Sequence, residues 1–231
     1  MKYREAKEYR AAIEQRGMVL GLDNMTRLME VLGNPQDKLR FVHVAGTNGK
    51  GSVVTCLSRI LTDAGYRTGA YTSPAVFHPL EIYRIDGRRM NESYYGELMD
   101  SVREALEYLK TEKIYPTPFE IDTAIAFLYF MKEKCDIVCL ETGLGGALDA
   151  TNCIKTVECA VLTSISMDHM KVLGATIEEI AGQKAGIIKE GCTVVSGIQR
   201  TGVRNVLEQV CREKHARLAV VDEQRLHTRI T

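Results

Sequence analysis

The sequence lacks an excess of either charge. Its 30 Lys and Arg residues equal its 30 Asp and Glu residues, so the formal net charge is zero. No obvious basic stripe occurs either, and a protein that holds nucleic acid usually needs one to neutralise phosphates. We therefore expect no nucleic-acid partner, although a ligand with a few phosphates would need only a local positive site.

Long hydrophobic runs are also missing. No apolar run approaches the roughly 20 residues that a helix needs to span a bilayer. Residues 1–7 are charged and contain no hydrophobic signal region. From these two absences we expect a cytoplasmic protein without a membrane partner.

The cysteines lack the pattern of a disulfide framework or a zinc site. There are seven, an odd number, and no Cys-x-x-Cys pair occurs. Several, such as Cys139 and Cys159, lie inside apolar runs. We expect reduced core residues of a cytosolic protein.

The features that are present predict an α/β fold. The 231 residues are 45% hydrophobic, enough for one substantial core or for one domain with a partial second. Short apolar runs alternate with helical spacing, which predicts a doubly wound, mostly parallel sheet. Strands are expected at residues 41–44, 68–72, 136–141, 159–164, 193–196 and 218–221. Helices are expected at residues 3–16, 23–33 (capped by Asp23), 50–64, 93–110, 119–132 (apolar on most sides), 176–188 and 203–214.

Residues 73–90 differ from the rest of the pattern. Two prolines, Pro74 and Pro79, keep the first part irregular. Residues 81–90 then predict a small hairpin that turns at Asp86 and Gly87. The segment is either a mobile substrate loop or an ordinary surface connection.

The most informative segment is residues 44–52, Val-Ala-Gly-Thr-Asn-Gly-Lys-Gly-Ser. It follows an expected strand and precedes an expected helix, which is the order in which chains hold nucleotide phosphates. The glycines let the backbone approach the anion, the helix-start N–H groups point at it, and the lysine adds a positive charge. The expected phosphate-binding residues are Gly46, Thr47, Asn48, Gly49, Lys50, Gly51 and Ser52.

The spacing of this loop departs from the usual phosphate-loop pattern. That pattern requires glycine at position 44 and Ser or Thr at position 51, whereas the chain has Val44, Gly51 and a hydroxyl delayed to Ser52. A plain GTPase or kinase is therefore less favoured. The alternative is a tight glycine turn with a solvated lysine.

Further polar residues follow the other expected strands. Ligands favour the carboxyl ends of strands in such sheets, and Ser73 and Glu141 lie at two of those ends. Together with Ser52 they offer the hard oxygen ligands that Mg²⁺ prefers. His169, after a further strand, could bind a second metal ion. A solvated glutamate and a structural histidine are the alternatives.

Six segments in this order resemble one family. They are residues 44–52, 71–74 (Tyr-Thr-Ser-Pro), 141–152 (Glu-Thr-Gly-Leu-Gly-Gly-Ala-Leu-Asp-Ala-Thr-Asn), 162–169, 173–181 and 184–189. Together they resemble folylpolyglutamate synthase/dihydrofolate synthase, which belongs to the Mur-type, ATP-dependent amide-bond ligases. The resemblance extends from near residue 20 to about residue 198. It implies a P-loop-type ATPase domain.

The resemblance implies a role for most of the candidate residues. The loop at residues 46–52 would hold ATP, with Lys50 on the outer phosphates. Ser73 and Glu141 would bind the first Mg²⁺, with Ser52 close to it. His169 would bind a second Mg²⁺.

Four more positions match the family. Lys184 matches a lysine that family members carry as a carbamate, a modification that exchanges a cation for an anion able to orient Mg²⁺ or its waters. Without the resemblance, Lys184 would be assigned as a surface lysine on a helix. Pro74, Asp149 and Asn152 would lie on the substrate side.

The implied reaction joins L-glutamate to a folate or pteroate. The substrate carboxylate attacks the γ-phosphorus of ATP, and the amino group of glutamate then displaces phosphate from the acyl phosphate. No side-chain nucleophile is required. Two alternatives stay open: a Mur-like ligase that acts on another carboxylate, and a nucleotide-binding switch or scaffold without ligase chemistry.

Three positions depart from the family pattern. Ala75 and Ala147 replace the usual His and Arg, which affects the expected identity of the acceptor more than ATP binding. Gln183 replaces the usual Glu beside Lys184 and alters the surroundings of the carbamate.

The family also has a second, C-terminal domain whose Asp-Gly-Ala-His-Asn type motif does not occur in residues 1–231. The resemblance therefore implies that residues 1–231 form the ATP-binding domain, incomplete at its C-terminal end. We expect this chain to be a monomer that binds nucleotide weakly and does not complete the ligation alone.

Overall fold

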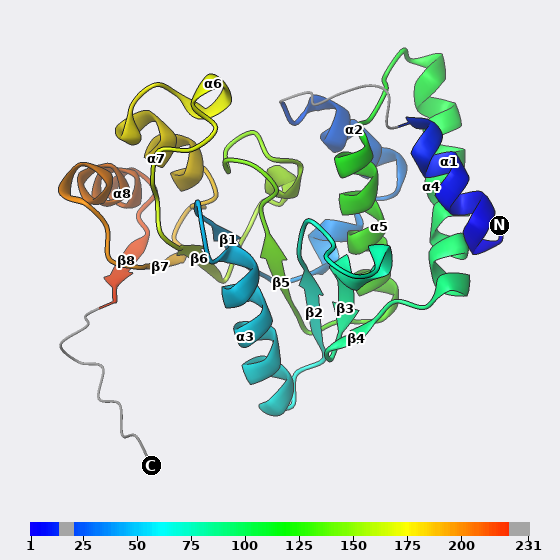
Figure 1. The fold of residues 1–231 in the computed structure, drawn as a ribbon, viewed down its shortest axis with the longest axis horizontal. Coiled ribbons are helices and arrows are strands. Elements are labelled where there is room, and N and C mark those ends of the chain that lie inside the picture. The colour runs from blue at the N-terminus through cyan, green and yellow to red at the C-terminus, as the bar shows by residue number, and fades with distance from the viewer. Residues whose placement is uncertain (14–20, 222–231) are drawn as a thin grey trace.

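The computed structural model describes residues 1–13 and 21–221. These residues form one eight-stranded sheet with helices on its two faces (Figure 1). The strands are β1 (Phe41–Ala45), β2 (Thr68–Tyr71), β3 (Tyr83–Ile85), β4 (Arg88–Arg89), β5 (Ile137–Glu141), β6 (Cys159–Leu162), β7 (Thr193–Ser196) and β8 (Arg217–Val220). The helices are α1 (Tyr3–Ile13), α2 (Asp23–Val31), α3 (Lys50–Asp63), α4 (Glu92–Thr111), α5 (Pro118–Lys132), α6 (Met170–Leu173), α7 (Ile177–Ala185) and α8 (Thr201–Glu213). Short 3₁₀ turns are η2 (Pro35–Lys38), η3 (Pro79–Ile82) and η4 (Ala150–Cys153).

The strand order places β1 in the middle of the sheet. The order is β4-β3-β2-β5-β1-β6-β7-β8. The β2–β3 and β3–β4 pairings are antiparallel, and the other five pairings are parallel. From β1 the chain crosses over β5 to reach β2, and later returns to the other side of β1 at β6. The carboxyl end of β1 is therefore the point where the strand order reverses, and such points form crevices for ligands.

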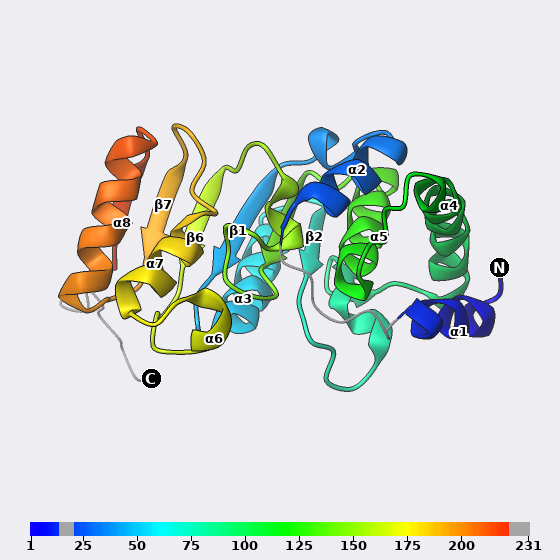
Figure 2. The ribbon, with the colours of Figure 1, turned by 90° about the horizontal axis from the view of Figure 1, so that it is seen from above.

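Two apolar layers hold the helices on the sheet. Helix α3 covers one face of β1, β2 and β5 through a small cluster that includes Val44, Val54 and Cys139. The larger core lies on the other face, where Phe41 and Phe127 meet edge to face with ring centroids 5.5 Å apart. Seen from above, α7 and α8 lie at one end of the sheet, and α1 and α4 at the other (Figure 2).

Most predicted elements are confirmed, and the differences have local causes. Asp23 is not a cap but the first residue of α2, because Leu22 occupies the cap position without a side-chain bond. The strand predicted at residues 159–164 ends at Leu162, since the next residues bind the glycine loop. The predicted helix 3–16 is confirmed to Ile13, and its last residues lie outside the described part of the chain.

Other predictions are confirmed in detail. The prediction of a buried helix at residues 119–132 is right, because α5 is buried on nearly all sides. Thr176 and Glu179 form a capping box at the start of α7, which ends at Ala185 rather than near residue 188. The hairpin turns at Asp86 and Gly87, as predicted. Among the described residues, no helix is long and apolar enough to cross a membrane.

A histidine is buried inside the central strand. His43 is completely buried, and its Nε2 lies 2.9 Å from the hydroxyl of Thr151 in η4. Its Nδ1 has no hydrogen-bond partner among the described residues. Burial, followed by the charge of Lys189, lowers the pKa of His43 to about 3. The imidazole is therefore neutral in the folded chain and links β1 to the loop after β5.

The buried His43 should make the fold sensitive to acid. Between pH 6.5 and 3 the unfolded chain binds a proton on His43 that the folded chain does not, so the free energy of unfolding falls as the pH falls. From pH 7 to pH 5 the wild type should lose about 2 kcal/mol relative to His43→Asn. Urea unfolding at the two pH values measures this difference. An equal gap between the two proteins at both pH values would contradict it.

Candidate functional site

The glycine loop after β1 has the geometry of an anion site. Gly46 has φ +153°, and an added Cβ would lie 1.8 Å from Thr163 Oγ1. Gly49 has φ +85° and occupies the N-cap of α3, so the chain turns sharply into the helix. The first N–H groups of a helix have no intrahelical partner and favour anions. A side chain would clash at position 46 and would strain the backbone at position 49, which explains the two glycines.

A second loop, residues 163–166, fixes the glycine loop. The N–H of Thr47 donates to the Ser164 carbonyl at 2.7 Å. The Thr47 hydroxyl donates to the Ser166 carbonyl at 3.2 Å and accepts from the Ser166 N–H at 3.1 Å. The Ser164 hydroxyl donates to the Asn48 carbonyl. These hydrogen bonds give Ser164 and Ser166 a structural role and present the loop in one conformation.

Two lysines meet at the carbonyl of Gly46. The Nζ of Lys50 donates to it at 3.2 Å, and the Nζ of Lys184 donates to it at 2.9 Å. Lys50 also lies 3.4 Å from the Thr47 carbonyl. Residues 138 apart along the chain are thus joined at the start of the glycine loop.

Lys184 has an unusual environment for a lysine. It lies near the end of α7 and is only 3% exposed. Burial, and then the charge of Lys50, lower its pKa to about 8, although Asp168 acts in the opposite direction. Near neutral pH its amine is therefore neutral far more often than that of an ordinary lysine, whose pKa is near 10.4.

Glu141 lies beside the same loop, at the end of β5. It is 5% exposed, and its Oε2 accepts the N–H of Ser73 at 3.2 Å. A Cβ added to Gly51 would lie 3.2 Å from the same oxygen, so Glu141 contacts the first turn of α3. Burial raises the pKa of Glu141, whereas the Ser73 N–H and the charge of Lys50 lower it. The structure thus brings Ser73, Glu141 and Lys50 to one edge, with Ser52 exposed on the adjacent helical turn.

His169 lies outside this cluster. It precedes α6 with φ +46°, its side chain is exposed, and its Nε2 is 3.7 Å from the Asp168 carboxylate. No group of three or more His, Cys, Asp or Glu residues that could hold a metal ion occurs within residues 1–13 and 21–221. The second metal ion at His169 stays a prediction.

The two polar residues predicted on the substrate side are buried. Asp149 is 4% exposed, and its carboxylate accepts the N–H groups of Leu144 and Thr151. Asn152 is 6% exposed, and its amide donates to the carbonyls of Ala147 and Gly186. In this structure both side chains hold residues 143–152 together and against the end of α7.

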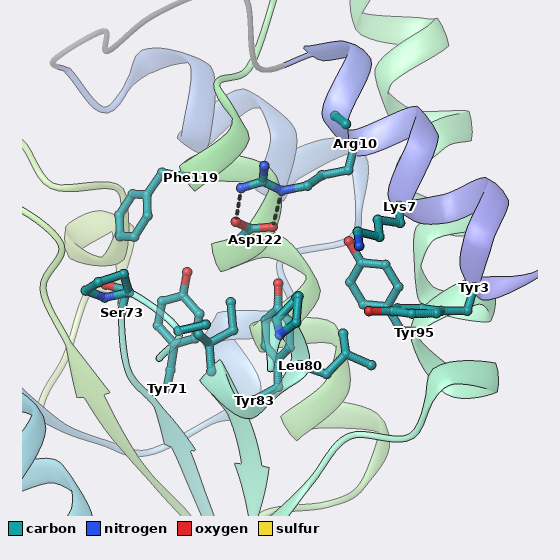
Figure 3. A pocket seen from close by; sticks show the side chains of 15 residues that line it. Tyr3, Lys7, Arg10, Tyr71, Ser73, Leu80, Tyr83, Tyr95, Phe119 and Asp122 are labelled. Atoms are coloured by element: carbon teal, nitrogen blue, oxygen red, sulfur yellow. Dashed lines mark hydrogen bonds and ion pairs between the residues drawn. The ribbon is translucent and has the colours of Figure 1, made fainter. Parts of the chain in front are cut away.

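Pro74, the third residue predicted on the substrate side, lines a cavity of about 460 Å³. Aromatic rings cover much of its wall, and an ion pair between Arg10 and Asp122 lies across from Tyr71 and Tyr83 (Figure 3). The sequence reasoning missed this cavity. No sequence signal was available for it, because Tyr71 and Tyr83 are brought onto one face by the pairing of β2 with β3, which lies outside the expected hairpin at residues 81–90.

The chain is an α/β domain with a strand-order reversal in a mostly parallel sheet, a glycine loop at a helix start and two converging lysines. This is the arrangement with which α/β domains commonly hold phosphates. Residues 44–216 match the family model described as "Mur ligase middle domain", and the chain belongs to this family. It is 43% identical over 216 residues to dihydrofolate synthase/folylpolyglutamate synthase of Bacillus subtilis. This match covers 93% of this chain and 50% of that protein. It is 41% identical over 172 residues to folylpolyglutamate synthase of Lacticaseibacillus casei, covering 74% of this chain and 40% of that one.

Solved structures agree with this family. The fold matches a structure described as an FPGS–AMPPCP–folate complex with a TM-score of 0.91 and 34% identity, covering 96% of this chain and 55% of that one. It matches folylpolyglutamate synthase of Thermotoga maritima with a TM-score of 0.87 and 36% identity. This match covers 96% of this chain and 50% of that one. The resemblance predicted from the sequence is confirmed. The chain spans about half the length of these relatives.

The buried amine of Lys184 should show in the pH dependence of stability. Between pH 8 and 10.5 the unfolded chain binds a proton on Lys184 that the folded chain does not, so the free energy of unfolding rises with pH in this range. From pH 7.5 to pH 10, in buffer free of CO₂, the wild type should gain about 2 kcal/mol relative to Lys184→Met. Denaturant unfolding measures the gain, and a pH-independent gap between the two proteins would contradict it.

Proposed function

We propose that this chain is the ATP-binding part of a ligase that joins L-glutamate to the carboxylate of a folate or pteroate. The observation that carries the proposal is the convergence of Lys50 and Lys184 on the Gly46 carbonyl, at the edge that also holds Glu141 and Ser73. The relatives named dihydrofolate or folylpolyglutamate synthase support the choice of substrates. The described residues are the Mur-ligase-like domain, and the ligase would have a further C-terminal domain.

ATP would bind with its phosphates on the N–H groups of the glycine loop and of the first turn of α3. The Nζ of Lys50, which now contacts two loop carbonyls, would move to the outer phosphates and offset their charge. The substrate carboxylate attacks the γ-phosphorus and ADP leaves, which forms an acyl phosphate. The amine of glutamate then attacks the carbonyl carbon, loses a proton, and phosphate leaves. The chain contributes orientation and charge rather than a nucleophile.

The residues at this edge fit Mg²⁺. Glu141 supplies one buried carboxylate, and Ser73 and Ser52 supply hydroxyls. Mg²⁺ usually takes only one or two carboxylates and completes its shell with waters and phosphates, so one acidic side chain suffices. When bound, the ion would neutralise charge between the outer phosphates. The proposal includes a second Mg²⁺ ion held by His169, as the resemblance implies.

The environment of Lys184 fits a lysine that is modified to a carbamate. Its neutral amine attacks CO₂, forms a C–N bond and loses a proton, so that a cation becomes an anion. The lowered pKa of Lys184 supports this step, because only the neutral amine reacts. The carbamate on Lys184 would face Lys50, whose positive charge would stabilise it.

That the protein is a monomer and lies in the cytoplasm are predictions from the sequence.

Lys50→Ala should remove the charge that holds the outer phosphates. In this chain we expect the affinity for AMPPCP, measured by calorimetry, to fall at least about 10-fold. In a protein of the relatives' full length, phosphate release that requires both the pteroate or folate and L-glutamate should fall about 100-fold or more. Lys214→Ala, which removes an exposed lysine after α8, is the matched control.

Two results would overturn this assignment. One is full phosphate release by Lys50→Ala. The other is wild-type ATP turnover that is indifferent to L-glutamate, which would favour a switch or scaffold. A panel of other carboxylates in the same assay would identify a Mur-like ligase with a different acceptor.

The carbamate can be tested by its own signal. After incubation with ¹³C-labelled bicarbonate, the wild type should show a carbamate carbon resonance that Lys184→Arg lacks. Lys189→Arg is the matched control, because Lys189 is half-buried and also has a lowered pKa but donates to the Asn152 carbonyl. An unchanged resonance in Lys184→Arg, or none in the wild type, would contradict the modification.

A further inference from the structure

We propose that Gln199 is a positioning residue for nucleotide binding, because its side-chain amide holds residues 163–166, which in turn hold the glycine loop. The inference rests on the proposed function, since it takes the glycine loop to be the site of the ATP phosphates. Gln199 would act through the backbone of residues 163–166 rather than by contact with the nucleotide. It adds a residue, outside the site itself, that would set the affinity for the nucleotide.

The amide of Gln199 bonds to two backbone groups that are two residues apart. Its Nε2 donates to the Thr163 carbonyl at 2.6 Å, and its Oε1 accepts the N–H of Ile165 at 3.2 Å. The Nε2 also donates to the hydroxyl of the buried Ser196 at 3.3 Å. A carbonyl can only accept and a backbone N–H can only donate, so these contacts allow one orientation of the amide. Gln199 thus uses both ends of its amide on the same segment.

Gln199 lies half-buried in the segment that joins β7 to α8 (Figure 2). The pairing of β6 with β7 extends to the bond from the Gly197 N–H to the Leu162 carbonyl. Gln199 continues this pairing with side-chain groups, which meet the next backbone groups of the neighbouring segment. Glutamine carries both a donor and an acceptor, whereas methionine, of similar length, has no donor and only a weak acceptor. The contact therefore depends on the amide group rather than on the length of the side chain.

Residues 163–166 have two backbone edges. An antiparallel bridge at Ser164 shows that the segment is extended, and in an extended segment the carbonyl of one residue and the N–H two residues later point to the same side. The two groups that bond to Gln199 form one edge. The Ser164 carbonyl and the Ser166 N–H form the opposite edge, and both bond to Thr47 of the glycine loop, at 2.7 and 3.1 Å. Gln199 and Thr47 thus lie on opposite sides of the same short segment.

Loss of the Gln199 amide would loosen the glycine loop. The carbonyl of Thr163 and the N–H of Ile165 would lose this partner, and the segment could then turn away from Thr47. The glycine loop would populate conformations that do not match the phosphates. A ligand that binds one conformation loses affinity in proportion to the fraction of chains in that conformation. A loop that is competent in one chain of about five would therefore bind about five-fold more weakly.

The first test measures the binding of AMPPCP to this chain by calorimetry. Gln199→Met keeps the length of the side chain and removes the amide, and it should weaken AMPPCP about five-fold. Gln199→Asn keeps the amide on a shorter side chain, so it should also weaken AMPPCP without placing an apolar group in this segment. Gln209→Met is the matched control, because Gln209 is exposed on α8 and bonds to Glu213. It should bind AMPPCP as the wild type does.

The second test measures amide hydrogen exchange by NMR. In Gln199→Met the amides of Thr47 and Ser166 should exchange at least about 10-fold faster than in the wild type, because their local opening becomes more frequent. The ratio of their rates to that of the Thr151 amide, which donates to Asp149, should rise as well. A general loss of stability would not raise this ratio, so the measurement separates local positioning from a purely structural role.

The inference is overturned if AMPPCP binds Gln199→Met as tightly as it binds the wild type, or if the Thr47 and Ser166 amides keep their wild-type exchange rates. Either result would leave the ligase assignment, which is decided by glutamate-dependent phosphate release in a protein of the relatives' full length. ATP turnover that is indifferent to L-glutamate would remove that assignment, while faster exchange at Thr47 and weaker binding of AMPPCP would still support the role of Gln199. A wild type that does not bind AMPPCP would remove both.

Discussion

The site depends on one backbone carbonyl, that of Gly46, which accepts hydrogen bonds from the ammonium groups of two lysines. This contact is available because Gly46 has no side chain and its backbone lies directly against Thr163. Through it, β1, α3 and α7 meet at the point where the strand order reverses. A positive site therefore forms in a chain whose net charge is zero.

The same contact sets the chemistry of Lys184. Its amine is buried next to another ammonium group, and both conditions disfavour the charged form. Glu141 is similarly buried and also interacts electrostatically with Lys50. The cluster therefore contains poorly solvated groups of both signs. Ligands with negative phosphates and a divalent cation would satisfy these groups, which is the requirement of an acyl-phosphate ligase.

The sequence was sufficient to predict the parts of the site that depend on chain order. Strand, glycine loop and helix follow one another at residues 41–63, and the polar residues after β2 and β5 had to meet at one edge once the sheet was parallel. The sequence was insufficient where packing decides the outcome. It did not show, for example, that Asp149 and Asn152 are buried and form hydrogen bonds within the loop that carries them, and their place on the substrate side stays a prediction. The cavity was missed because Arg10 and Asp122 lie 112 residues apart, and they meet only in the folded chain, where α1 packs on α4 and the Arg10 side chain reaches α5.

A crystal structure of this chain with AMPPCP and Mg²⁺ tests the central claim most directly. The account predicts that the Nζ of Lys50 leaves the carbonyls of Gly46 and Thr47 and contacts the outer phosphates, that phosphate oxygens accept N–H groups of residues 49–52, and that the ion lies between Glu141 and Ser73. Nucleotide bound elsewhere, or bound here with Lys50 still on its own loop, would contradict the account.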